Sequence, residues 1–186
     1  QKNRPDVLKR ARYSLHCKDW LFLRLTGTAA TDPSEANFIF GDFRTRAYDP
    51  VILDELGAGE AKRLLPPIVD GVREAIPLSA RAAGETGLKA GTPVVLGYVD
   101  VICTGVGGGL YDPEGRTGCT IVGSTGMHMR LAPRASDVRL NEQKSGYSMA
   151  FPVDGMVAMI QSNMASTINI DWLLDMARGI LKDQGV

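Results

Sequence analysis

The chain has 186 residues, of which 44% are hydrophobic and 23% charged. A chain of this length and composition can bury a sizeable core, which argues against an intrinsically disordered protein. Lysine and arginine total 21 and aspartate and glutamate also total 21. The chain therefore lacks the basic excess typical of proteins that neutralise nucleic-acid phosphates, and we expect no nucleic-acid partner.

The cysteines and the apolar runs predict the compartment. Cys17, Cys103 and Cys119 are widely spaced and form no C-x-x-C pair, so neither a disulfide framework nor a zinc site is indicated and a reducing, cytoplasmic location is expected. No apolar run approaches the ~20 residues of a membrane span, so we expect no membrane partner. Because the chain opens on Gln1 rather than methionine, we expect it to be a piece of a longer protein.

The first third of the chain carries helix signals. Pro5 suits the first position of a short helix that ends near Arg12. Residues 18–26 form a second helical segment, which Gly27 can end in the left-handed conformation. In the segment Asp32-Pro33-Ser34-Glu35, the aspartate is a candidate N-cap, the proline suits the first helical position and the glutamate suits the third.

Asp100 follows a short apolar run. Residues 94–98 are apolar and partly β-branched, a pattern typical of a buried strand. A carboxylate at the C-terminal edge of such a strand lies where open α/β sheets place their ligands. The alternative is a helix N-cap, because an aspartate accepts hydrogen bonds from the exposed amides of a first helical turn. The sequence around Asp100 leaves both interpretations open.

The last part of the chain predicts two hairpins and a helix. A polar turn at 112–118 is the predicted linker between two units. Beyond it, residues 118–123 and 127–131 predict one hairpin, and the Asp154-Gly155 turn predicts a second between residues 145–153 and 156–162. The final segment, from about 166 to 182, predicts a helix with an apolar stripe.

The first hairpin is joined through Gly123-Ser124-Thr125-Gly126. Two hydroxyls between glycines would let backbone amides approach a phosphate without a Cβ in the way. An ordinary hairpin turn uses the same residue types, so this alternative also stays open.

Taken in chain order, these segments resemble the FGGY family of carbohydrate kinases. The family's K-D-[YW]-L, R-L-T-G and T-D-x-S-x-A motifs are similar to Lys18-Asp19-Trp20-Leu21, Leu25-Thr26-Gly27 and Thr31-Asp32-Pro33-Ser34-Glu35-Ala36. At the family's spacing follow Gly84-Glu85-Thr86-Gly87-Leu88, Gly91-Thr92-Pro93-Val94 and Gly97-Tyr98-Val99-Asp100. Gly123 to Gly126 resemble its G-T-S-G phosphate motif. The agreement extends over more than half of the chain.

The resemblance implies an α/β fold of the ribonuclease-H-like, actin-like ATPase type, with parts of two domains. Residues 1–111 would be the second half of the N-terminal kinase domain, and residues 119–186 the start of the C-terminal one. The implied activity is ATP-dependent phosphorylation of a primary hydroxyl of a small sugar or polyol, in the cytoplasm. A homodimer is an expected assembly.

The resemblance also implies roles for individual residues. Asp100 matches the catalytic base and is a candidate ligand of the Mg²⁺ that accompanies ATP. Gly123, Ser124, Thr125 and Gly126 match the turn that binds ATP phosphate. The segment from Thr167 to Trp172 matches one that lies toward the nucleotide.

Three departures from the family pattern bear on function. Val101 stands where many members carry Asn or Gln, and the sequence Gly97-Tyr98-Val99-Asp100-Val101 is nearer to the polyol kinases of the family. The family's D-x-G-T-T segment is absent, and so is its C-terminal G-G-G-x adenosine motif, since no G-G-G run follows the predicted linker. A non-catalytic sugar-binding or structural member of the same fold is therefore the alternative prediction.

Overall fold

The computed structural model describes residues 3–112, 114, 116–143, 145–153 and 155–185 and divides the chain into two compact units. The first unit comprises residues 1–103 and 149–155, and the second comprises residues 104–148 and 156–186. Pro113 and Gly115 of the predicted linker lie outside the described residues. The domain boundary at 112–118 stays a prediction.

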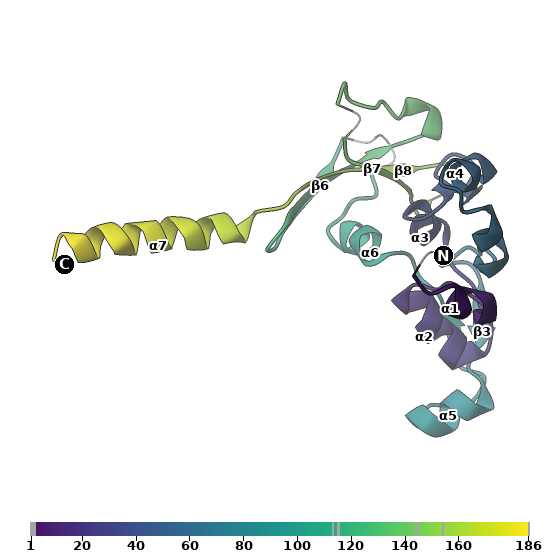
Figure 1. Ribbon diagram of the computed structural model, residues 1–186. Helices are drawn as coiled ribbons and strands as arrows, with labels where there is room; N and C mark the ends of the chain where they lie inside the picture. The colour runs from purple at the N-terminus through teal and green to yellow at the C-terminus, as the bar shows by residue number, and fades with distance from the viewer. Residues whose placement is uncertain (1–2, 113, 115, 144, 154, 186) are drawn as a thin grey trace. The chain divides into compact units, whose positions relative to one another are not determined.

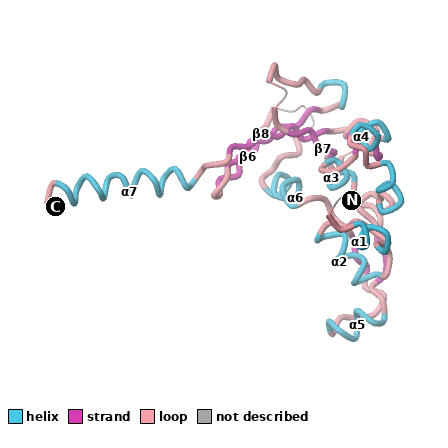
Figure 2. The backbone as a smooth tube through the Cα atoms, in the orientation of Figure 1, coloured by secondary structure: helices cyan, strands magenta, loops and turns pink. Residues whose placement is uncertain are grey.

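The first unit consists mainly of short helices joined by loops (Figures 1 and 2). In chain order they are α1 (Pro5–Arg10), α2 (Cys17–Thr26), α3 (Pro33–Asn37), α4 (Pro50–Glu55), the 3-10 helix η1 (Gly59–Leu64) and α5 (Ala80–Thr86). Gly27 ends α2 in the left-handed conformation, with φ of 83°. Asp32 caps α3 by accepting hydrogen bonds from the amides of Ser34 and Glu35. These start and stop signals are confirmed, and α1 ends two residues before the predicted position.

The strands of the first unit are short and antiparallel. β1 (Gly41–Asp42) pairs with β2 (Ala47–Tyr48), and β3 (Ala75–Pro77) pairs with β4 (Pro93–Val95). Among the described residues of this unit, parallel pairing occurs as an isolated bridge between Thr31 and Ile68.

The predicted buried strand over residues 94–98 is confirmed as a strand for residues 94 and 95 alone, and neither of these is buried. β4 ends at Val95, whose side chain is 53% exposed. Gly97 then takes a left-handed conformation with φ of 74°, which no strand continues. Leu96, Tyr98 and Val99 are nevertheless buried. The run is apolar because it is a loop inside the core of the unit.

Apolar side chains from helices and strands pack together in the first unit. Phe22, Ala30 and Leu96 form one cluster, against which Val69, Ile76 and Val94 pack. A neighbouring cluster of Leu78, Ala82 and Ala83 contacts Leu25 and the same Val94. Leu96, four residues before Asp100, is thus anchored to α2 through Phe22.

The second unit holds most of a four-stranded sheet, of which Met149 and Ala150 at the end of β7 are counted with the first unit. Its strands are β5 (Gly118–Val122), β6 (Gly126–Ala132), β7 (Tyr147–Ala150) and β8 (Val157–Asn163), in the order β5-β6-β8-β7. In Figure 2 the long strands β6 and β8 are drawn in magenta. The first predicted hairpin is confirmed, with Val122 opposite Gly126. β7 and β8 are neighbours as the second requires, and Asp154 of its turn lies outside the described residues.

Three further helices complete the described chain: α6 (Asp100–Gly107), the 3-10 helix η2 (Ala135–Asp137) and α7 (Thr167–Asp183). Figure 1 shows α7, in yellow, continuing from the end of β8. Its bounds agree with the prediction to within one residue. None of the described residues of α7 is buried, and its apolar stripe is therefore exposed. None of the described helices is both long and apolar enough to cross a membrane.

The exposed stripe of α7 leads to an expected result for the 186-residue chain produced by itself. Ile170 and Leu174, one turn apart, are 57% and 47% exposed, and a contiguous apolar face of this kind drives association. Changing Ile170→Glu together with Leu174→Lys places a favourable ion pair on the same face and keeps the helix. We expect size-exclusion chromatography to show association of the unchanged chain and a larger monomer fraction for this double variant.

The matched control changes the polar side of the same helix. Asp171→Glu with Asp175→Lys introduces the same residue types at the same spacing but leaves the apolar stripe intact. Equal monomer fractions for the two double variants would contradict the role assigned to the stripe.

Candidate functional site

The loop Gly97–Val99 leads into Asp100 and is tied down along its length. The Gly97 amide donates to the Gly71 carbonyl at 2.6 Å. The Val99 amide donates to Oγ of the buried Ser34 at 3.0 Å. The Tyr98 carbonyl accepts from Sγ of Cys103 at 3.3 Å. Because each loop residue has a hydrogen-bonded partner, the start of α6 is fixed.

Gly71 lies against this loop so closely that no side chain fits. A Cβ at this position would lie 2.1 Å from the Gly97 carbonyl oxygen and 3.2 Å from Cβ of Asp32. The sequence does not predict this role for Gly71, since a lone glycine in a turn carries no signal of which backbone it touches. It is nevertheless one of the residues that hold the loop before Asp100.

Asp100 is the first residue of α6 and is exposed. Its Oδ1 accepts from the Val101 amide at 2.7 Å, whereas the Ile102 and Cys103 amides donate to the Val99 carbonyl. Asp100 therefore lies inside the helix rather than at the capping position, and the N-cap interpretation is wrong. Among the hydrogen bonds of the described residues, none uses Oδ2 of Asp100, which leaves that oxygen available to a substrate.

Arg46 holds the tyrosine two residues before Asp100. Its guanidinium donates to the Tyr98 hydroxyl and, at 2.9 Å, to the Phe151 carbonyl. Burial raises the pKa of Tyr98 to about 12, although the charge of Arg46 acts in the opposite direction. The phenol is thus neutral at physiological pH. Arg46 itself has a φ of 55°, a conformation that costs energy for a non-glycine residue and that clusters at functional sites.

A buried polar cluster contacts Val99 through Ser34. The side chains of Asp19, Asp32, Ser34 and Glu35 are buried, and Lys18 is their cationic partner. Burial by itself would lower the pKa of Lys18, but attraction and hydrogen bonding to Asp32 and Asp19 outweigh burial and raise it. Lys18 is therefore charged at neutral pH. His16 contacts Glu35 at the edge of the cluster.

The turn between β5 and β6 is fixed by hydrogen bonds inside the second unit. The Gly123 amide donates to the Thr125 carbonyl at 3.0 Å, and the Gly126 amide donates to Oδ1 of Asn163 at 3.1 Å. A Cβ on Gly126 would lie 2.8 Å from that same oxygen. The close approach of Asn163 is therefore the reason that this position requires glycine. Ser124 and Thr125 are exposed at the tip of the turn.

The N-terminus of α7 is bonded to this turn. The amides of Ser166 and Thr167 donate to the carbonyls of Ser124 and Gly123 at 2.9 and 3.0 Å, and Oγ1 of Thr167 also donates to the Gly123 carbonyl. The positive end of a 17-residue helix therefore adjoins the backbone of Gly123 and Ser124. The Ser166 and Thr167 amides are taken up by these carbonyls, so the turn gains from α7 the field of its dipole rather than free amides.

Residues 1–107 match a sequence profile described as the N-terminal domain of the FGGY family of carbohydrate kinases. The chain belongs to the FGGY family. This confirms the resemblance carried by the motifs from Lys18 to Asp100. The matched residues contain Asp100 with the whole loop that holds it, whereas the Ser124 turn lies beyond them.

One relative of this FGGY chain matches almost all of it, and another matches half of it. The erythritol kinase of Brucella abortus is 52% identical over 95% of this chain. The L-xylulose/3-keto-L-gulonate kinase of Escherichia coli is 37% identical over 50% of it. The chain spans 34% of the length of the first relative and 18% of the second.

Solved structures show the same fold. A xylulose kinase from Rhodospirillum rubrum matches 94% of this chain, which covers 34% of that structure, with a TM-score of 0.78 and 20% sequence identity. The predicted fold class, parts of the ribonuclease-H-like, actin-like ATPase fold, is thereby confirmed.

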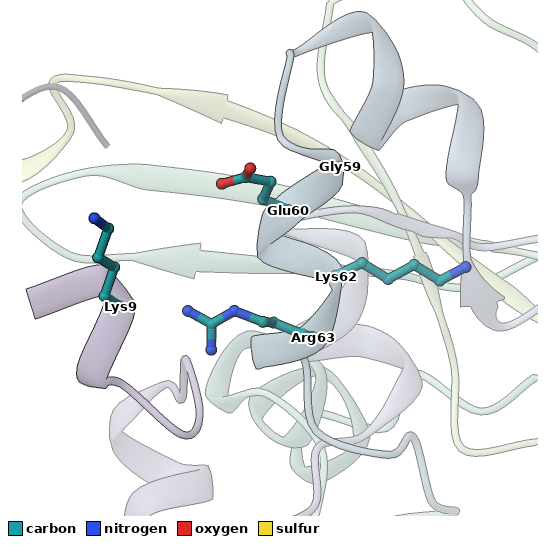
Figure 3. Close-up of a pocket in the computed structure, with 5 residues that line it drawn as sticks. All are labelled: Lys9, Gly59, Glu60, Lys62 and Arg63. Atoms are coloured by element: carbon teal, nitrogen blue, oxygen red, sulfur yellow. The ribbon is translucent and has the colours of Figure 1, made fainter. Parts of the chain in front are cut away.

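A surface pocket of the first unit is lined by other residues than the predicted site residues (Figure 3). Lys9 of α1 and residues of η1 line it, among them Gly59, Glu60, Lys62 and Arg63. Arg63 already donates to the carbonyls of Ala11 and Leu8 at 3.0 and 2.6 Å. Neither Asp100 nor the Ser124 turn is among the lining residues, so the pocket does not define the site.

Proposed function

We propose that the protein to which this chain belongs transfers the γ-phosphoryl group of ATP to a primary hydroxyl of a small polyol or ketose, with Asp100 as the catalytic base. The observation that carries the proposal is an exposed carboxylate at the end of a loop whose every residue is hydrogen-bonded, in a chain of the FGGY family. The Brucella relative is described as an erythritol kinase and is 52% identical in sequence, which supports the four-carbon polyol erythritol as the first substrate to test.

Asp100 would act on the attacking hydroxyl. Oδ1 holds the Val101 amide, so Oδ2 is the atom that would accept the hydroxyl proton. The substrate oxygen forms a bond to the γ-phosphorus, the bond from that phosphorus to the bridging oxygen of ADP breaks, and ADP leaves. A carboxylate that orients the hydroxyl and takes its proton late is sufficient, because phosphoryl transfer depends mainly on positioning and charge neutralisation.

The Ser124 turn would bind phosphate. Because the amides of Gly123 and Gly126 already donate within the protein, we assign the direct contacts to Ser124 and Thr125, with the N-terminus of α7 behind them. Gly123 and Gly126 would act by shaping the turn.

Magnesium fits this site only as a companion of ATP. The described residues contain no group of three His, Cys, Asp or Glu side chains able to hold a metal ion. Mg²⁺ commonly takes one or two carboxylates together with substrate phosphates and water. Asp100 would therefore be its protein ligand, and Mg²⁺ would neutralise phosphate charge.

Ser124→Ala tests the phosphate assignment. It removes one hydroxyl donor to a charged group, which is worth about 1.5–3 kcal/mol, so we expect the KM for ATP to rise about tenfold or more while the KM for the polyol changes little. Ser136→Ala, an exposed serine of the same unit, should change neither. Equal increases in both KM values for Ser124→Ala would argue against phosphate binding.

The experiment for the whole proposal is a coupled ADP-release assay on the full-length protein with a panel of tetritols, pentitols and ketopentoses. We expect turnover with at least one polyol. Binding of a polyol in calorimetry without any ADP release would instead support the non-catalytic sugar-binding member of the fold. The division into domains at 112–118, cytoplasmic location and a homodimer belong to the same proposal and stay predictions.

A further inference from the structure

Four polar side chains are buried beside the loop that carries Asp100. Asp32 and Ser34 are each 0% exposed, and Asp19 and Glu35 are 2% and 7% exposed. Burying carboxylates costs free energy unless they are paired, and paired buried charges can often be replaced by apolar residues without loss of stability. A contribution to folding stability is therefore a weak explanation for the presence of these buried charges.

The cluster is arranged around Lys18. Its ammonium lies 2.7 Å from Oδ2 of Asp32 and 3.2 Å from Oδ1 of Asp19. With Oδ2 held by Lys18, the other oxygen of Asp32 accepts from the Ser34 amide at 2.9 Å and from the Ser34 hydroxyl. A serine hydroxyl has one hydrogen. Because Asp32 accepts that hydrogen, only the lone pairs of Ser34 Oγ remain for other partners.

Those lone pairs accept the Val99 amide at 3.0 Å. Val99 directly precedes Asp100, and its carbonyl accepts the amides of Ile102 and Cys103, which begin α6. Ser34, 65 positions earlier in the chain, therefore holds the residue from which the helix of Asp100 starts. A displacement of about 1 Å at a reacting group can cost about 10²-fold in rate.

We propose that Ser34, oriented by the buried Lys18–Asp32 pair, is a positioning residue that sets where the Asp100 carboxylate meets the substrate hydroxyl. This rests on the proposed role of Asp100. Ser34 itself touches no reacting atom, so its effect must pass through Asp100. The proposal can therefore be tested by comparing the effect of a Ser34 substitution in the protein with Asp100 and in the Asp100→Asn protein.

The experiment is a double-mutant cycle in the full-length protein. Ser34→Ala is made alone and together with Asp100→Asn, and kcat and both KM values are measured with ATP and the best polyol. We expect Ser34→Ala to lower kcat about ten- to hundredfold when Asp100 is present and less than about threefold when Asn occupies that position. The KM for ATP should stay within about twofold.

The matched control is Ser79→Ala. Ser79 also accepts a backbone amide, that of Ala82 at the start of α5, but has no link to Val99. It should lower stability slightly and leave kcat unchanged in both backgrounds. If Ser34→Ala does not fold, Ser34→Cys replaces it, because a thiol is somewhat larger than the hydroxyl, leaves no cavity and accepts a hydrogen bond only weakly.

The outcomes separate the two proposals. An active protein in which Ser34→Ala has no effect on kcat, or lowers it by the same factor in both backgrounds, overturns the positioning role alone. A wild-type protein without kinase activity, or an Asp100→Asn protein with normal turnover, overturns the proposed function first.

Discussion

Asp100→Asn in the full-length protein is expected to lower kcat by about 10²- to 10⁴-fold, the range typical of removing a general base. The amide keeps the shape of the side chain and an oxygen for the Val101 amide, which Asp100 accepts at 2.7 Å, but it cannot take a proton. The thermal midpoint and the KM for ATP should therefore change little. Steady-state kinetics with the best polyol of the panel, together with a thermal melt, measure all three quantities.

Asp49→Asn is the matched control for this change. Asp49 accepts the Val51 amide at 2.8 Å as the N-cap of α4, and asparagine caps as well as aspartate. We expect its kcat to equal that of the unchanged protein. If Asp100→Asn also turned over normally, Asp100 would not be the base, whatever the family resemblance implies.

Local signals predicted the helices well because the cause of each end lies within a few residues. Asp32 and Pro33 start α3, and Gly27 ends α2, through contacts with their immediate neighbours. The hairpin through Ser124 was predictable for the same reason. Backbone rules of this kind do not depend on what packs against the segment.

The loop before Asp100 could not be predicted in this way. Leu96, Tyr98 and Val99 are apolar because they are buried, and a buried loop and a buried strand have the same composition. Gly97 is the residue that distinguishes a loop from a strand here, because it adopts a left-handed conformation. Its amide donates to the Gly71 carbonyl, 26 positions earlier in the chain, and the sequence alone does not indicate this partner. The partners of the site are distant in sequence, so spacing alone does not reveal them.

The family motifs contain the residues of the buried cluster but do not reveal that they form one network. Lys18, Asp32 and Ser34 were identified as parts of family motifs, but not as one network. Their connection is a set of hydrogen bonds between α2, α3 and the Val99 loop. It follows from the way these segments pack, and the residue types by themselves leave it undetermined.

Gly71→Ala is expected to be the most damaging small substitution in the first unit. The added Cβ would lie 2.1 Å from the Gly97 carbonyl oxygen and 2.8 Å from its carbon. Both are backbone atoms, so no rotamer change relieves the clash, and the Gly97 to Gly71 hydrogen bond of 2.6 Å would be lost. Overpacking typically costs about 1–3 kcal/mol, and occasionally more. We expect a loss at the upper end of this range, with a fall in kcat because the loop of Asp100 moves.

Gly84→Ala provides the opposite control in the same unit. Gly84 lies within α5 and is exposed, and no atom lies within 4 Å of the position its Cβ would take. In a helix interior, alanine is more stable than glycine by roughly 0.5–1 kcal/mol. In urea unfolding of the full-length protein, the free energy of unfolding should therefore be lower than that of the unchanged protein for Gly71→Ala and higher for Gly84→Ala. A Gly71→Ala protein as stable and as active as the Gly84→Ala protein would show that the Gly71 contact does not hold the loop before Asp100.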